Sequence, residues 1–95
     1  FARPDAALVK LIVRAHQARK TLNATTSVEA AAAQLGLTQR YFAVLLRLSF
    51  LAPDITAAIL DGKQPIALNR QRLARLGNLP LDWREQRALL GFALA

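Results

Sequence analysis

The stretch that decides the fold is VEAAAAQLGLTQRYFAVLLRL, which occupies residues 28–48. Gly36 divides it into an alanine-rich part around Ala32 and a part in which apolar residues recur every three or four positions. This spacing predicts two helices joined by a tight turn, because glycine readily adopts the positive φ that ends a helix and a small residue such as Ala32 lets the second helix cross closely over the first. The wedge between these helices and the first helix of the chain is expected to hold Leu35, Leu37, Phe42 and Leu45. The stretch is therefore predicted to be a helix-turn-helix over about residues 27–51.

Capping signals place the helices around this motif. Asp5 is expected to cap the first helix, and Thr38 the second helix of the motif. The residues from Thr26 to Glu29 match a capping box, in which the Thr26 hydroxyl and the Glu29 carboxylate satisfy each other's backbone amides. In the first helix, residues at helical spacing form an apolar stripe in which one position, Arg19, is charged. The stripe consists of Leu8, Leu11, Ile12, Ala15, Arg19 and Leu22. Pro53 is expected to begin a later helix, Asn69 and Asp82 to cap two more, and Gly62, Gly77 and Gly91 to end three of them. The expected helices span about residues 5–22, 27–35, 39–51, 53–60, 69–76 and 83–90.

The fold class follows from these elements. No alternation of apolar and polar residues typical of strands is found, so the chain is predicted to be all-α, a small bundle of about six short helices. Its 95 residues suit a single domain, in which residues 53–91 form a helical extension after the helix-turn-helix. The chain begins with Phe1 and contains no Met. It is expected to be a piece of a longer protein.

The charge is strongly positive. Thirteen Lys and Arg face six Asp and Glu, for a net charge of +7, and ten of the basic residues are Arg. Residues 6–50 carry a net +5, whereas residues 51–95 carry +2. Such a balance indicates nucleic acid, an anionic membrane or an acidic protein as partner. The preference for Arg favours phosphate and guanine, which its planar fork can bind in bidentate fashion.

Several classes of function are excluded by composition. The chain has no Cys and one His, so it can form neither a disulfide nor a thiolate or multi-histidine metal site. We expect no metal, no cofactor and no catalytic residue. No uncharged apolar run approaches the roughly 20 residues of a membrane span, so no membrane partner is expected. If the anionic partner of this chain is DNA, we expect the protein to be cytoplasmic and associated with the nucleoid.

Periodicity divides the second helix of the motif, about residues 38–50, into two sides. Its inward side is predicted to carry Phe42, Leu45, Leu46 and Ser49. Its outward side, which could enter a major groove, is predicted to carry Thr38, Gln39, Arg40, Ala43, Val44 and Arg47.

The outward residues suit contacts with duplex DNA. Gln39 could bind adenine and Arg40 guanine, both in bidentate fashion. Ala43 and Val44 offer apolar contact to a thymine methyl, and the Thr38 hydroxyl could bind a phosphate. Further phosphate contacts are expected from Arg47, Lys10, Arg14 and Lys20.

Short sequence segments throughout the chain resemble those of one protein family. YFAVLLRL at residues 41–48, LAPDI at 51–55 and ILDGKQP at 59–65 resemble the C-terminal region of bacterial and phage site-specific serine recombinases of the resolvase/invertase type. The resemblance extends to residues 8–19 and 79–87. It implies a non-catalytic DNA-binding module that partners an upstream catalytic domain in the parent protein. The family's nucleophilic serine would lie in that domain, because Ser27 opens a helix and Ser49 lies in an apolar one, without a cluster of arginines.

Other functions remain open from the sequence. The motif is also similar to the helix-turn-helix of ParB/KorB-type plasmid partition proteins, which leaves a partition or transcription-regulator domain as an alternative. A plain helical hairpin would show the same glycine turn. A helical protein-interaction or dimerisation module, hence a homo-oligomer, could use Ala43 and Val44 together with Phe92, Ala93 and Leu94.

A few residues outside the motif are chemically distinctive. Trp83 is expected to anchor the last helix on the core through its indole, and His16 to lie at the surface. Asp82 and Glu85 fit helix caps, and Asp54 and Asp61 face different sides of one helix. A second basic cluster consists of Arg70, Arg72 and Arg75, with Lys63 near it; it could follow a phosphate backbone or be a solvated surface.

Overall fold

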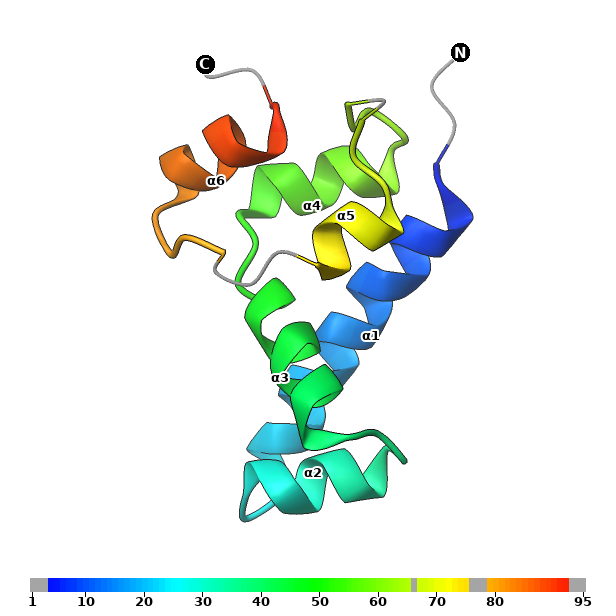
Figure 1. Cartoon of the computed structure of the whole chain (residues 1–95), viewed down its shortest axis with the longest axis vertical. Helices are drawn as coiled ribbons and strands as arrows, with labels where there is room; N and C mark the ends of the chain where they lie inside the picture. The colour runs from blue at the N-terminus through cyan, green and yellow to red at the C-terminus, as the bar shows by residue number, and fades with distance from the viewer. Residues whose placement is uncertain (1–3, 66, 76–78, 93–95) are drawn as a thin grey trace.

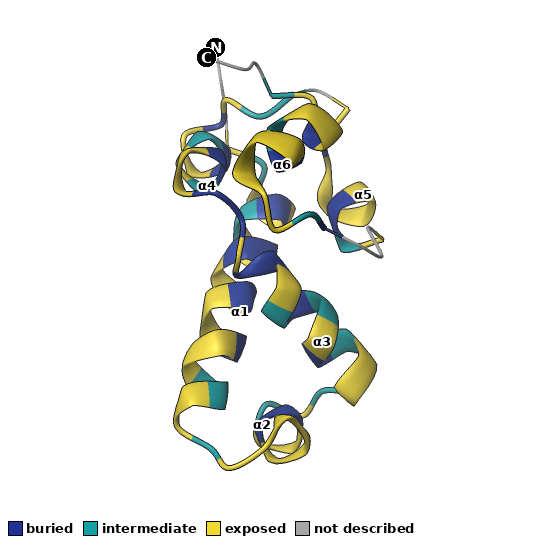
Figure 2. Ribbon diagram, turned by 90° about the vertical axis from the view of Figure 1, so that its left-hand side faces the viewer, coloured by how far each residue is buried: buried dark blue, intermediate teal, exposed yellow. Residues whose placement is uncertain are grey.

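The computed structural model describes residues 4–65, 67–75 and 79–92, and over these ranges the chain forms helices and no strand (Figure 1). This confirms the predicted all-α class. The helices are α1 (Ala6–Asn23), α2 (Val28–Gln34), α3 (Gln39–Leu48), α4 (Pro53–Leu60), α5 (Arg70–Ala74) and α6 (Trp83–Leu90). Helices α1 and α3 run side by side, α2 lies across one end of the pair, and α4, α5 and α6 gather at the other end (Figures 1 and 2).

Helix α1 is the element on which the others assemble. It packs against α2, α3, α4 and α5. Its start is fixed by Asp5, whose Oδ1 accepts hydrogen bonds from the amides of Ala7 (3.0 Å) and Leu8 (3.2 Å), as predicted. Its buried side is turned towards α3 (Figure 2) and consists of Leu8, Leu11, Ile12, Ala15 and Ala18.

The apolar stripe of α1 differs from the prediction in its last turns. Ala18 is buried, whereas Arg19 is exposed and Leu22 is half-buried. The Arg19 guanidinium lies 4.7 Å from the centre of the Phe50 ring, a cation–π contact that places its charge at the edge of the core. A long charged side chain can therefore follow helical apolar spacing without being buried.

Helix α2 begins one residue later than the capping-box prediction. Ser27, not Thr26, is the N-cap: its backbone is extended, and its Oγ accepts a hydrogen bond from the amide of Ala30 at 3.0 Å. Thr25 holds the preceding turn, because its hydroxyl donates to the carbonyls of Leu22 (3.3 Å) and Ser27 (3.4 Å). The reciprocal pair of Thr26 and Glu29 was therefore a wrong prediction.

The turn and the start of α3 match the prediction. Gly36 has a φ of +69°, and the amide of Leu37 donates to the carbonyl of Ala32 at 2.9 Å to close the turn. Thr38 caps α3, its Oγ1 accepting a hydrogen bond from the amide of Tyr41 at 3.1 Å. Ala32 is buried where α2 meets α1 and α3. The regular helix ends at Leu48 rather than at residue 51.

The last three helices also start as predicted. Pro53 occupies the first turn of α4. Asn69 Oδ1 accepts a hydrogen bond from the amide of Arg72 at 2.8 Å, and Asp82 Oδ1 accepts from the amides of Arg84 (2.8 Å) and Glu85 (3.2 Å). Helix α5 ends at Ala74, and the predicted ending at Leu76 and Gly77 falls outside the described residues.

Gln86, not Trp83, fastens α6 to the core. Gln86 is completely buried: its Oε1 accepts a hydrogen bond from the amide of Ala52 (2.8 Å), and its Nε2 donates to the carbonyls of Phe50 (3.1 Å) and Pro80 (2.7 Å). Trp83 is half exposed, so the prediction of an indole anchor was wrong. A single amide side chain thereby satisfies two backbone groups between α3 and α4 and one just before α6.

The buried apolar residues form one continuous core. It extends from Ala31 and Ala32 of α2, along α1 and α3, to Leu90 of α6. In the described ranges no single helix combines the length and apolar character needed to cross a membrane; α3 and α4 reach that composition only together, and the chain bends by 99° between them.

Candidate nucleic-acid interface

Helix α3 presents a polar and basic strip to solvent. Phe42 and Leu45 are buried beneath it against α1, as predicted, and Leu46 is half-buried. Gln39 and Arg40, in its first turn, are exposed. One turn apart along the same side, Ala43 and Arg47 are also exposed. Four of the six residues predicted on the outward side of the helix body therefore share one accessible strip, with its two cationic side chains two turns apart.

Val44 departs from the predicted outward set. It is half-buried and packs against the core, beside the half-buried Tyr41. At 100° per residue Val44 lies towards the Tyr41 side of α3, away from the strip centred on Ala43. The one apolar residue in the middle of the exposed strip is therefore Ala43. Its methyl group projects less far from the helix than the side chains around it.

The Thr38 hydroxyl caps α3 and can still donate a hydrogen bond. Its Oγ1 already accepts the hydrogen bond from the amide of Tyr41, and this cap sets where the helix begins. A hydroxyl can accept and donate at once, so the Thr38 O–H remains able to donate to a phosphate. The predicted phosphate contact is thus compatible with the observed cap.

The basic residues of α1 are divided between two sides of that helix. Arg14 and Gln17 line a hollow of about 220 Å³, whose other walls are Leu35 and Leu37 of the turn and Leu45 of α3. Arg14 therefore lies directly beside the helix-turn-helix, and Lys10 is one turn before it on the same side of α1. Lys20, six residues after Arg14, is rotated by about 120° around the helix. It occupies the last turn of α1, where a cation is favoured by the helix dipole.

Four of the basic residues on α1 and α3 have no acidic partner among the described residues. Lys10, Arg14, Lys20 and Arg40 are exposed, and none of them forms an ion pair with any residue that the structure describes. Unpaired charges of one sign at a surface attract a polyanion. Gln17 is not among the predicted DNA contacts, but its spacing of three residues from Arg14 places the two on one side of α1.

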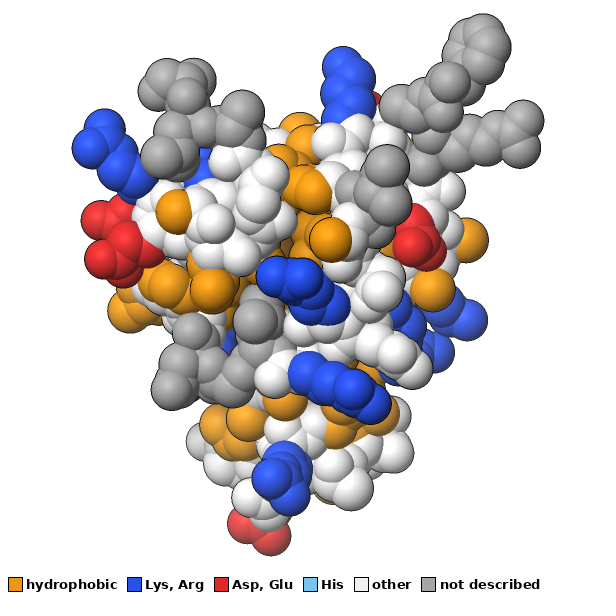
Figure 3. Space-filling model, turned by 45° about the horizontal axis from the view of Figure 1, so that its top comes forward, with side chains coloured by type: hydrophobic (Ala, Val, Ile, Leu, Met, Phe, Trp, Pro, Cys, Tyr) orange, Lys and Arg blue, Asp and Glu red, His pale blue; other side chains and the backbone are white. Residues whose placement is uncertain are grey.

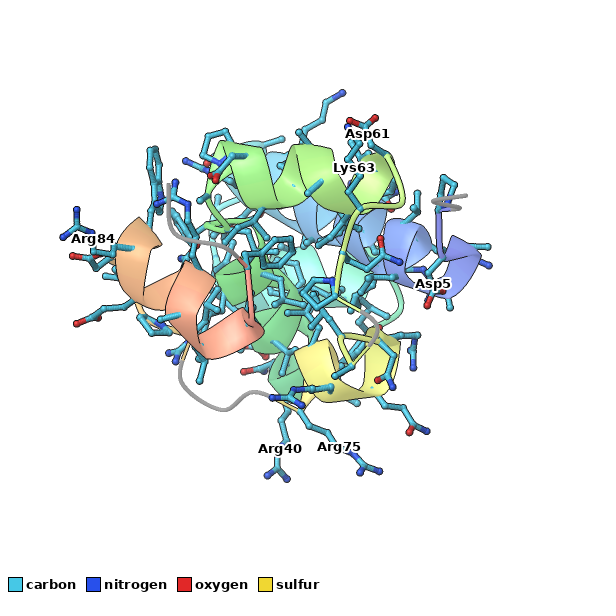
Figure 4. All side chains as sticks on the ribbon, turned by 90° about the horizontal axis from the view of Figure 1, so that it is seen from above. Asp5, Arg40, Asp61, Lys63, Arg75 and Arg84 are labelled. Carbon is cyan, nitrogen blue, oxygen red and sulfur yellow. The ribbon has the colours of Figure 1, made fainter. Side chains whose placement is uncertain are left out.

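The second basic cluster is also divided. Arg72 and Arg75 line a shallow hollow of about 420 Å³ together with Asn69 and Gln71. Arg70 does not line it. Figure 4 shows Arg75 and Arg40 extending from the same face of the molecule, whereas Lys63 and Arg84 lie on other sides. The structure thus places part of this cluster on the face of α3 and separates Lys63 from it.

An apolar groove of about 600 Å³ lies elsewhere on the molecule. Its exposed apolar lining is Phe50, Leu60 and Trp83, and its basic lining is His16 and Arg19. His16 is exposed there, as the surface prediction requires.

Of the residues predicted to form the partner surface of an interaction module, Ala43 is exposed. Val44 and Phe92 pack against the core, and Ala93 and Leu94 lie outside the described residues.

Both serine side chains make hydrogen bonds within the fold. Ser27 Oγ caps α2, and Ser49 is buried with its hydroxyl donating to the carbonyl of Leu46. Among the described residues, no three or more His, Cys, Asp or Glu side chains gather as metal ligands.

Comparison with protein-family models, with curated proteins and with solved structures gave no match to this chain.

Proposed function

We propose that the chain is a DNA-binding module in which α3 docks in the major groove of duplex DNA. The observation that carries this proposal is the exposed strip of α3, with Arg40 and Arg47 on it, held outward because the opposite side of the helix is packed on α1 and α2. A helix supported in this way from behind is the geometry of helix-turn-helix readers.

The exposed residues divide into base contacts and phosphate contacts. Gln39 and Arg40 lie in the first turn of α3, where side chains of a docked helix reach base edges, and they match adenine and guanine. Ala43 would lie close to the groove floor and suit a thymine methyl. The phosphate contacts proposed are Thr38, Arg47, Lys10, Arg14 and Lys20, and they position the module without reading sequence.

The parent protein is proposed from the sequence resemblance. Residues 41–65 and 79–87 support a site-specific recombinase of a mobile element, in which this module would be non-catalytic and would act beside a separate catalytic domain. A partition or transcription-regulator protein of the ParB/KorB kind is the alternative with the same DNA chemistry. The amino-acid sequence preceding Phe1 in the parent gene distinguishes the two, since a catalytic domain of the resolvase type there supports the recombinase.

Binding of a fluorescein-labelled, mixed-sequence duplex of roughly two helical turns tests the DNA function. Fluorescence anisotropy at about 50 and 200 mM salt should show affinity falling steeply with salt, because binding releases counterions from the phosphates. Arg40→Ala should weaken binding about tenfold, and Arg47→Ala should lower the slope of log K against log salt by about 0.9.

The control for these variants is Arg84→Ala, which removes a charge from α6, away from α3 (Figure 4). Far-UV circular dichroism confirms that each variant is folded. If Arg40→Ala and Arg47→Ala bind the duplex as the unmodified chain does, the assignment of α3 as the recognition helix is wrong.

A second candidate function is supported by the apolar groove. Its lining has no acidic residue, and Arg19 gives it a positive edge. Its chemistry therefore fits an acidic amphipathic segment of another protein. Titration with a synthetic helical peptide that has a leucine stripe and glutamates should change the fluorescence of Trp83, and the lysine version of the peptide should not. An unchanged Trp83 signal with both peptides excludes this function.

A further inference from the structure

The outer side of α5 is a hollow built from donors. Its lining consists of Asn69, Gln71, Arg72 and Arg75, all of which are exposed, and it includes no acidic side chain. Arg72 and Arg75 are three residues apart and therefore neighbours on the helix surface. Both are without an ion-pair partner among the residues that the structure describes. The hollow thus brings two guanidinium groups and two side-chain amides to one small area.

Helix α5, although short, is packed against the core. Leu73, on the opposite side of the helix, is completely buried, and Leu68 just before the helix is also buried. Asn69 Oδ1 is occupied as the cap by the amide of Arg72, which leaves the two N–H donors of the Asn69 amide available. The two guanidinium groups and the N–H donors of the Asn69 and Gln71 amides are therefore suited to an anion that accepts several hydrogen bonds, such as a phosphate.

The position of the hollow relative to α3 identifies which phosphate-bearing partner it suits. Arg75 of α5 and Arg40 of α3 extend from one face (Figure 4). In Figure 3, basic side chains follow one another down the middle of the visible face, and acidic side chains lie towards its edges. A row of cations alongside a groove-reading helix matches the line of phosphates beside the major groove.

We propose that the hollow is a second phosphate-binding element, in addition to the contacts made around α3. It binds the backbone of the same DNA duplex that α3 enters, through Arg72, Arg75 and the side-chain amides of Asn69 and Gln71. This inference rests on the proposed function and extends it: the helical extension after the helix-turn-helix contributes affinity to the complex. The hollow contacts backbone only, so it adds no sequence preference.

The test compares two double variants that remove the same charge. Arg72→Ala/Arg75→Ala removes two cations from the hollow, and Lys63→Ala/Arg84→Ala removes two from other sides of the molecule. Anisotropy with the labelled mixed-sequence duplex is measured over about 50 to 200 mM salt. We expect the first variant to lower the slope of log K against log salt by about 1.8, because each of two phosphates that is no longer neutralised accounts for about 0.9. The matched variant should leave the slope near that of the unmodified chain.

Each other outcome has a defined meaning. If both double variants lower the slope equally, the effect is general electrostatic attraction and the hollow is not a site. If Arg40→Ala weakens binding while Arg72→Ala/Arg75→Ala changes neither slope nor affinity, the second element is disproved and DNA binding by α3 stands. If neither Arg40→Ala nor Arg72→Ala/Arg75→Ala affects binding, both proposals fail. All five substituted positions are exposed, and circular dichroism checks that the variants fold.

Discussion

Gln86 shows how much one buried polar side chain can organise. Its amide joins the amide of Ala52 and the carbonyls of Phe50 and Pro80, three backbone groups from segments far apart in the sequence. Burial of an amide is tolerated because its carbonyl oxygen and its NH₂ group both find partners. The corner between α3 and α4 and the entry to α6 are thus fixed by the same residue.

Gln86→Ala is expected to lower the free energy of unfolding by about 2–4 kcal/mol, because it leaves buried backbone groups without partners and opens a cavity. Urea denaturation followed by circular dichroism measures the change. The exposed Gln34→Ala is the control and should stay within about 0.5 kcal/mol of the unmodified chain. Equal stability of the two variants would contradict the role given to Gln86.

At the scale of the element, the start of α2 depends on which of two adjacent hydroxyls meets the helix. Thr26 and Ser27 both have capping side chains, and the glutamate three residues after Thr26 favoured Thr26 in the sequence. In the fold, Thr25 bonds back to α1 and forward to Ser27, and this turn leaves Ser27 extended at the cap position. The conformation of the turn after α1 therefore decides that Ser27 is the cap, and the spacing of residues within α2 does not predict this.

Ser27→Ala is accordingly expected to destabilise the protein by about 1 kcal/mol, because the amide of Ala30 loses its acceptor. Thr26→Ala should change stability by no more than about 0.5 kcal/mol. Thermal or urea unfolding of the two single variants decides between the caps. A larger loss for Thr26→Ala than for Ser27→Ala would restore the capping box.

For the molecule as a whole, one exposed ion pair links the two ends of the helical extension. Arg87 Nε lies 2.7 Å from Asp54 Oδ2, and Arg87 Nη2 lies 2.8 Å from Asp54 Oδ1, so the pair is bidentate between α6 and α4. The hydrogen bonds from Arg87 hold the pKa of Asp54 below its usual value. A carboxyl with a lowered pKa in the folded state stabilises the fold above its unfolded pKa, near 3.8, and loses this effect as the pH falls through the lowered value.

Asp54→Asn should therefore lower the melting temperature at pH 7 and have less effect near pH 3, because below about pH 3.8 the carboxyl of the unfolded chain takes up a proton and the stabilisation begins to fall. Asp61→Asn removes the same charge from the C-terminal end of α4, where no ion pair forms with any described residue and the helix dipole disfavours an anion, so it should not lower the melting temperature. Scanning calorimetry of both variants at the two pH values measures the difference. Identical melting temperatures for the two variants at pH 7 would show that the pair does not stabilise the fold.

Much of the candidate site could be predicted from the sequence. Helical periodicity placed Gln39, Arg40, Ala43 and Arg47 on one exposed side of α3, because the side on which a residue lies depends on the geometry of a single helix. Val44 was misplaced because it lies at the margin of the apolar side, where a neighbouring element decides whether the residue is covered. The separation of Arg70 from Arg72 and Arg75 follows from helix geometry. That Arg75 extends from the same face as Arg40 does not, since it depends on how α5 is placed relative to α3 (Figure 4).

The sequence by itself determined the all-α class, the glycine turn, the caps at Asp5, Thr38, Asn69 and Asp82, and the excess of positive charge, because these depend on residues within a few positions of each other or on composition. Only the tertiary structure decided that Gln86 rather than Trp83 anchors α6, that Arg87 pairs with Asp54, and that α3 and α5 present arginines on one face. These features join residues more than 30 positions apart, and their energy comes from contacts that exist only once the helices have packed around α1.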